Sequence, residues 1–299
     1  MSKLLDIVNA PWALPAEKLS EIVAIYCAHV RGEKIDLKAL EAQLGRPLAN
    51  EQPPYEIRDG VALVGVQGVL AKRMNLLTRI SGGSSTEIIG RNLRAALDDP
   101  RVHAILLDID SPGGTVDGTQ TLAGEVYAAR GAKPIVSLAG GMMASAAYWI
   151  GSAAAESYIA EETTITGSIG VVMEHVDISR YEEKLGVKTT EIYAGKYKRI
   201  DSDYAPLSQE GRAYLQAIVD QMYSVFVDQV ARNRDTDADR VLKNMADGRL
   251  FVGRAAIDAG LVDGVSTLDA LIADMVAGRK PAGTKSAKAG SPAAGAAAG

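Results

Sequence analysis

The chain has 299 residues, of which 47% are hydrophobic and 23% are charged, and its net charge is -5 at pH 7. This composition predicts a globular protein with one large domain and appendages, and the acidic balance argues against a nucleic-acid-binding surface. The single cysteine, Cys27, excludes internal disulfides and zinc sites made of several cysteines, and such low cysteine usage fits a reducing cytoplasm.

Residues 1–52 are predicted to form a helical segment ahead of the main domain. Apolar residues recur at helical spacing over Pro15–Tyr26, and a second short helix is expected over Leu37–Leu44. The first residues include Asp6 and lack a long apolar run, so we expect no secretory signal. Two consecutive prolines at 53 and 54 mark the boundary to the main domain, which we assign to residues 53–276.

The main domain alternates apolar runs typical of strands with helical patterns. Strands are predicted at Ala62–Val66, Ile105–Ile109, Ile135–Leu138, Tyr158–Ala160 and Thr189–Tyr193, and helices at Thr86–Leu97, Gln120–Ala129, Tyr181–Lys184 and Glu210–Arg232. The alternation predicts a layered α/β fold with parallel strands and right-handed crossover helices. Near the end, Arg254–Asp263 predicts a short helix, a glycine cap and a final strand.

Two stretches have unusual composition. Pro134–Ala155 contains no charged residue, but it is rich in glycine, alanine and serine and is interrupted by Gly140 and Gly141. We therefore predict a strand, a turn and a buried helix there, and no membrane contact. Residues 277–299 contain almost only alanine, glycine, lysine, serine, threonine and proline, which predicts a disordered tail or linker.

Ser145 lies among small residues where the apolar stretch changes from a strand pattern to a helix pattern. Such turns hold the nucleophile of many serine hydrolases, because small neighbours let the backbone bend sharply. Upstream, the strand Ile105–Ile109 runs into Gly113 and Gly114, whose bare backbone amides are suited to an oxyanion hole. Each motif alone is also compatible with ordinary packing or an ordinary turn.

Lys196 and Lys198 follow Gly195 and the predicted strand Thr189–Tyr193. A lysine can act as a general base in place of histidine only when it is neutral, which requires a water-poor site without a carboxylate partner. Spacing alone leaves open which of the two lysines points inward.

Four motifs occur in a fixed order in this chain: Asp110-Ser-Pro-Gly-Gly114, Met143-Ala-Ser-Ala-Ala-Tyr-Trp-Ile150, Thr166-Gly-Ser-Ile-Gly-Val171 and Gly195-Lys-Tyr-Lys198. This order, over about residues 55–265, resembles the S49 or signal peptide peptidase A serine peptidases, and among them the capsid assembly proteases of tailed phages. The resemblance implies a ClpP/crotonase-like fold, a serine/lysine catalytic dyad and no cofactor or metal. It also implies polypeptide substrates, among them scaffold and head proteins, a homo-oligomer, and a location in the cytoplasm of a bacterial host or inside a procapsid.

Carried over by motif, Ser145 matches the nucleophile and Lys198 the general base. Ser168 matches the serine that orients the lysine, and the amides of Gly114 and Ala146 match the oxyanion hole. The chain departs from many cellular relatives at Ala146 and the following alanine, where a glycine pair is common. It also departs at Lys196, where an uncharged residue is common, and this change makes the choice of lysine less secure than the choice of serine.

Three alternatives remain at this stage. His175 is the one histidine placed to act as a rival base in a Ser-His-Asp arrangement. A crotonase-like acyl-CoA enzyme would also use an oxyanion hole after such a strand, and a catalytically silent procapsid protein could keep the same fold. A nucleophile reactive toward an acylating probe would separate a peptidase from a silent protein.

Overall fold

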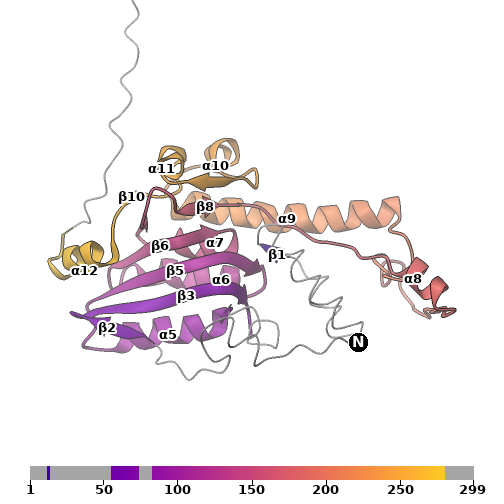
Figure 1. The fold of residues 1–299 in the computed structure, drawn as a ribbon, viewed down its shortest axis with the longest axis horizontal. Helices are drawn as coiled ribbons and strands as arrows, with labels where there is room; N and C mark the ends of the chain where they lie inside the picture. The colour runs from indigo at the N-terminus through magenta and orange to yellow at the C-terminus, as the bar shows by residue number, and fades with distance from the viewer. Residues whose placement is uncertain (1–11, 14–54, 74–82, 280–299) are drawn as a thin grey trace, which may run out of the picture.

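The computed structural model describes residues 12–13, 55–73 and 83–279. One sheet with the strand order β10-β7-β6-β5-β3-β2 forms the centre of the molecule (Figure 1). Its strands, with the short strands that extend it, are β1 (Trp12–Ala13), β2 (Glu56–Arg58), β3 (Val61–Ala71), β4 (Ser84–Ser85), β5 (Ala104–Thr115), β6 (Ile135–Ala144), β7 (Glu156–Ile159), β8 (Ile165–Gly167), β9 (Leu250–Val252) and β10 (Gly264–Val265).

The strands of the central sheet are mostly parallel, and helices connect them. The helices are α5 (Thr86–Asp98), α6 (Thr119–Ala129), α7 (Ala146–Gly151), α8 (Ser179–Lys184), α9 (Gln209–Asn233), α10 (Ala238–Asn244), α11 (Arg254–Ala259) and α12 (Leu268–Val276). Parallel pairing of β3 with β5 and of β5 with β6, through α5 and α6, confirms the predicted layered α/β fold.

Both faces of the sheet are buried, which explains why β5 reads as a continuous apolar run. Ile105, Leu107 and Ile109 belong to the core shared with α5, α6, α7 and α9. Ala104 and Leu106 point to the opposite face and share a smaller core with α12. Strands buried on both faces lose the alternation of polar and apolar residues that marks a one-sided sheet.

Most of the predicted elements are confirmed within one or two residues at one end or both. The stretch without charges becomes β6, a turn and the fully buried α7, as expected. No helix among the described residues is long and apolar enough to span a membrane. The helices expected over Pro15–Tyr26 and Leu37–Leu44, and the tail from residue 280, lie outside the described residues.

Three predictions about the strands need correction. Thr189–Tyr193 is not a strand, because it runs outside the sheet with no neighbouring strand to pair with, and Ile192 is 96% exposed. Gly113 and Gly114 lie inside β5, which extends to Thr115, and do not follow its end. The final strand begins at Gly264, just after the predicted range, where β10 pairs with β7.

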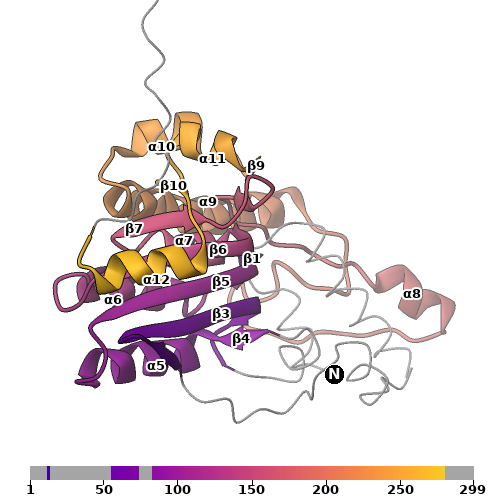
Figure 2. The same ribbon diagram turned by 60° about the vertical axis from the view of Figure 1, so that its left-hand side comes forward.

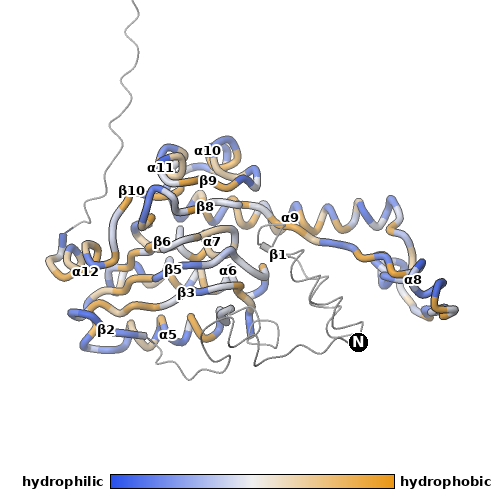
Figure 3. Tube along the Cα trace, viewed as in Figure 1, coloured by the Kyte–Doolittle hydropathy of each residue, from blue (hydrophilic) through white to orange (hydrophobic). Residues whose placement is uncertain are grey.

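One part of the chain projects away from the sheet. We call residues 171–222 the arm; they include α8 and the N-terminal half of α9 (Figures 1 and 2). No hydrophobic side chain between Ile169 and Phe226 is buried, so the arm contributes nothing to the two cores. The tube coloured by hydropathy has apolar stretches along the arm as well as in the sheet (Figure 3).

Candidate active site

The candidate site lies at the carboxyl ends of β5 and β6, where both strands leave regular pairing. Between Ile109 and Ser111 the register with β6 shifts, because β6 carries two additional residues at Gly140 and Gly141. Asp110 stabilises this bulge, since its Oδ1 accepts a hydrogen bond of 3.0 Å from the Met142 amide. Such bulges redirect a strand near a functional site.

Ser145 joins β6 to α7 in a strained turn. Its backbone has φ 54° and ψ -120°, a conformation that L-residues rarely adopt and that costs roughly 1–3 kcal/mol. Two backbone hydrogen bonds hold the turn: the Ser145 amide donates to the Gly167 carbonyl at 2.7 Å, and the Trp149 amide donates to the Ser145 carbonyl at 2.9 Å. The strand-to-helix turn expected from the sequence is therefore present.

The Ser145 hydroxyl has no hydrogen-bond partner among the described residues, although it is fully buried. A buried hydroxyl without a partner is costly, and natural proteins keep such groups mainly where they have a role. The helix behind it is firmly fixed: the Tyr148 hydroxyl donates to the Leu261 carbonyl at 2.9 Å, and burial raises the pKa of Tyr148, so the phenol stays a neutral donor.

Ser168 lies next to Ser145 in the sheet register. β8 pairs in parallel with β6 so that Gly167 is opposite Ala144, and each serine follows directly. Neighbouring strands lie about 4.8 Å apart, so the two serines leave the sheet side by side. Ser168 also has a positive φ, 52°, and its amide donates to the Arg249 carbonyl at 2.8 Å. The structure thus brings together two of the predicted site residues.

The glycine pair of β5 is shaped for close backbone approach. A Cβ atom on Gly114 would lie 1.8 Å from the Leu70 carbonyl oxygen, so only glycine fits there. The Gly113 amide donates to the Ser111 hydroxyl at 3.1 Å, and that hydroxyl donates to the Gly68 carbonyl at 2.6 Å. Because Gly113 is already bonded within the protein, Gly114 is the better candidate for an oxyanion donor.

Ala146 begins α7, and it is fully buried directly after Ser145. The first amides of a helix have no carbonyl partner within the helix, so they can face a developing negative charge. The supporting roles of Ser111 and Asp110 did not emerge from the sequence. A signal for them was present in Asp110-Ser-Pro-Gly-Gly114, but their partners lie more than thirty residues away.

Lys198 is not near Ser145 in the same chain. It lies exposed in a turn of the arm, where its amide donates to the Gly195 carbonyl at 3.0 Å. The adjacent Tyr197 stacks on Tyr214 of α9 with 5.2 Å between ring centroids. The turn is therefore attached to the outer half of α9.

The length of α9 sets the separation between the lysine turn and the serine. Phe226 of α9 stacks on Trp149 of α7, with 4.2 Å between ring centroids, close to Ser145. Tyr214 precedes Phe226 by twelve residues, which corresponds to roughly 18 Å along the helix axis. A lysine side chain spans only about 6 Å, so Lys198 does not reach Ser145 of its own chain in this arrangement.

Lys196, the competing lysine, is engaged elsewhere. Its Nζ lies 2.6 Å from Oε1 of Glu210, and the hydrogen bond with this carboxylate raises the pKa of Lys196. A lysine held in its charged form by a carboxylate is a poor general base. Both lysines are exposed on the arm, so neither points inward within this chain, and the contact with Glu210 leaves Lys198 as the candidate base.

The rival base His175 also lies on the arm. Its Nε2 is 3.0 Å from the Ser202 carbonyl oxygen, a backbone contact that involves no nucleophile. No group of three or more histidine, cysteine, aspartate or glutamate side chains that could bind a metal ion occurs in the described part of the chain.

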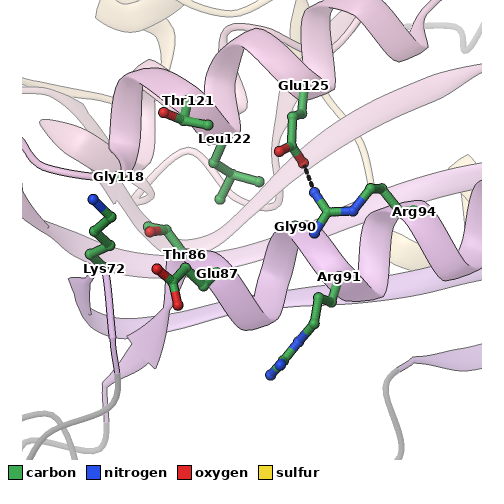
Figure 4. A pocket seen from close by; sticks show the side chains of 10 residues that line it. All are labelled: Lys72, Thr86, Glu87, Gly90, Arg91, Arg94, Gly118, Thr121, Leu122 and Glu125. Atoms are coloured by element: carbon green, nitrogen blue, oxygen red, sulfur yellow. Dashed lines mark hydrogen bonds and ion pairs between the residues drawn. The ribbon is translucent and has the colours of Figure 1, made fainter.

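A separate pocket of about 320 Å³ lies between α5 and α6, and Ser145 is not among the residues that line it (Figure 4). Two of its basic side chains form ion pairs: Arg94 Nη1 lies 2.5 Å from Glu125 Oε2, and Lys72 Nζ lies 3.1 Å from Asp117 Oδ1. None of the predicted site residues lines this pocket, so we do not assign the chemistry to it.

Comparison with known proteins agrees with the motifs. The family model "Peptidase family S49" matches residues 128–280, a range that includes Ser145, Ser168 and Lys198. The chain belongs to peptidase family S49. It is 36% identical over 218 residues to capsid assembly protease C of Escherichia phage lambda, covering 73% of this chain and 49% of that protein.

A second phage relative is the head-tail preconnector protein GP5 of Enterobacteria phage P21, with 31% identity over 233 residues, 77% of this chain and 46% of the relative. The chain thus spans about half the length of these curated relatives. A ClpP1 variant from Listeria monocytogenes is similar in structure, with a TM-score of 0.43 and 13% identity over 72% of this chain and 94% of that one.

Proposed function

We propose that this chain is a serine endopeptidase with a serine/lysine dyad, which cleaves scaffold or other head proteins while a phage or prophage capsid assembles in a bacterial host. The observation that carries the proposal is the strained turn at Ser145, which presents a buried hydroxyl next to Ser168 with no hydrogen-bond partner among the described residues. The names of the two phage relatives support the role in head assembly.

In the proposed reaction, the Ser145 hydroxyl attacks the carbonyl of a substrate peptide while the neutral amine of Lys198 takes its proton. The amides of Gly114 and Ala146 donate to the oxyanion, and each such donor contributes about 3–4 kcal/mol to transition-state stabilisation. Ser168 orients the lysine. The protonated lysine then gives its proton to the leaving amine, and water hydrolyses the acyl-enzyme.

The dyad requires the lysine of a second copy, because Lys198 lies far along the arm from Ser145 of its own chain. The arm is suited to docking on another protomer: its exposed apolar side chains are Tyr181, Leu185, Val187, Ile192, Tyr193, Tyr197 and Tyr214. A segment that buries no apolar side chain against its own domain does not offset the entropy of its ordering, so contact with a partner would stabilise it.

Labelling with a fluorophosphonate probe tests the nucleophile. Covalent modification of Ser145, located by peptide mass spectrometry, supports a peptidase. A well-folded sample that remains unlabelled would favour a silent procapsid protein, and specific binding of acyl-CoA would favour the crotonase-like alternative. Ser145→Ala serves as the control that must remain unlabelled.

Matched lysine variants test the base. Lys198→Met abolishes cleavage with folding intact, whereas Lys196→Met, two residues away and paired with Glu210, retains most activity. The acidic limb of the kcat/KM profile reports the lysine base and persists in His175→Gln. Loss of activity in Lys196→Met with activity retained in Lys198→Met would show that the base is misassigned.

A further inference from the structure

The short strand β1 adds to the sheet at the candidate active site. Trp12 pairs with Thr115 and Ala13 pairs with Gly114, in antiparallel orientation. In this way a segment from the beginning of the chain lies against the glycine that we assign to the oxyanion hole. In both views, β1 lies at the carboxyl ends of β5 and β6 (Figures 1 and 2).

The register shows which edge of β5 the segment occupies. One edge is filled by β3, which pairs with β5 as far as Leu70 and Gly114. The other edge is filled by β6 only as far as the pair of Ser111 with Met143, after which β6 ends. A strand has two edges, so β1 pairs with the edge of β5 that is left free beyond the end of β6. This is the same side of β5 on which β6 continues into Ser145.

This edge is where a substrate peptide must bind for the proposed reaction. A peptide whose carbonyl faces the Gly114 amide runs along the same backbone groups that β1 occupies, and extended peptides are commonly bound by strand addition. Ser145 is 1% exposed, so the nucleophile is closed to solvent in this state.

We propose that the segment Trp12–Ala13 occupies the strand position of the substrate and acts as an intramolecular competitor at the site. The proposal rests on the proposed peptidase function of Ser145. Covalent tethering keeps the segment at a high effective concentration, while a ladder of only two residues leaves it displaceable by a longer peptide strand. The protease is thereby restrained until a substrate strand or a partner displaces the segment.

A reversible cross-link tests the competition in the full chain. Trp12→Cys and Thr115→Cys are introduced into a Cys27→Ala background, which removes the native cysteine. Directly paired antiparallel residues lie within disulfide distance, so oxidation links the two positions. We expect oxidation to slow cleavage of labelled casein at least tenfold and dithiothreitol to restore it. Trp12→Cys with Glu56→Cys, on the far strand β2, is the control that does not cross-link.

The outcomes separate this inference from the proposed function. Absence of the disulfide in a folded protein, or equal cleavage by the oxidised and reduced forms, would overturn the competition and leave the peptidase assignment standing. If the Cys27→Ala parent cleaves nothing and a fluorophosphonate leaves Ser145 unlabelled, the proposed function fails and the competition fails with it. A tenfold, reversible loss supports the inference.

Discussion

Mixing two inactive variants should restore activity if each site takes Ser145 from one protomer and Lys198 from a neighbour. We expect this sharing for the proposed dyad, because roughly 18 Å of α9 separates the part that carries the lysine turn from the part that packs near the serine. In a one-to-one mixture of Ser145→Ala and Lys198→Met, a site is complete when its serine comes from the second variant and its lysine from the first. Random assembly gives about one quarter of wild-type activity.

The assay combines co-assembly, confirmed by native mass spectrometry, with cleavage of a labelled peptide. A one-to-one mixture of wild type with the double variant Ser145→Ala/Lys198→Met provides an independent measure. Its activity, relative to the same total amount of wild type, is about one quarter when sites are shared between protomers and about one half when each chain holds its own site. Mixed assemblies with no restored activity, together with the value of one half, would refute the shared site.

Three further predictions concern stability and the oxyanion hole. Hydrogen bonds from Arg101 hold the pKa of Asp99 well below its usual range. This carboxylate therefore stabilises the fold at pH values above its ordinary pKa of about 3.9, and the stabilisation is lost as the pH falls below that value. The Tm difference between wild type and Asp99→Asn should shrink from about pH 7 to about pH 3. Phe226→Ala removes the stack on Trp149 and should lower the free energy of unfolding by about 3–5 kcal/mol in urea titrations. Gly114→Ala forces a Cβ against a β3 carbonyl and should lower kcat by about 100-fold or more; near-normal kcat would exclude this amide from the oxyanion hole.

The sequence predicted the strands and helices whose residue pattern lies within one continuous segment of the chain. Ile105–Ile109 is an unbroken apolar run because the strand is covered on both faces, and such a run indicates a central strand without knowledge of its neighbours. Thr189–Tyr193 has an equally suitable composition. However, a strand also requires a partner, and composition does not reveal that the arm leaves the sheet.

The candidate site was predictable in its residue types but not in its geometry. Ser145 is identifiable from its small neighbours, whereas its positive φ depends on the Gly167 carbonyl, which lies in another strand. The bond between Asp110 and the Met142 amide likewise joins distant segments. The position of Lys198 depends on where α9 carries the arm, a tertiary property that no local pattern contains.

The length of α9 has a mechanical consequence. The helix is anchored at one end, where Phe226 packs on Trp149, and bears the lysine turn near the other. A tilt of about 5° at the anchor displaces a point roughly 18 Å away by about 1.6 Å. Misplacement of a catalytic group by about 1 Å can cost 100-fold in rate. The outer end of α9 therefore needs contacts of its own to fix its position. The rate of cleavage would then depend strongly on how rigidly those contacts hold the arm.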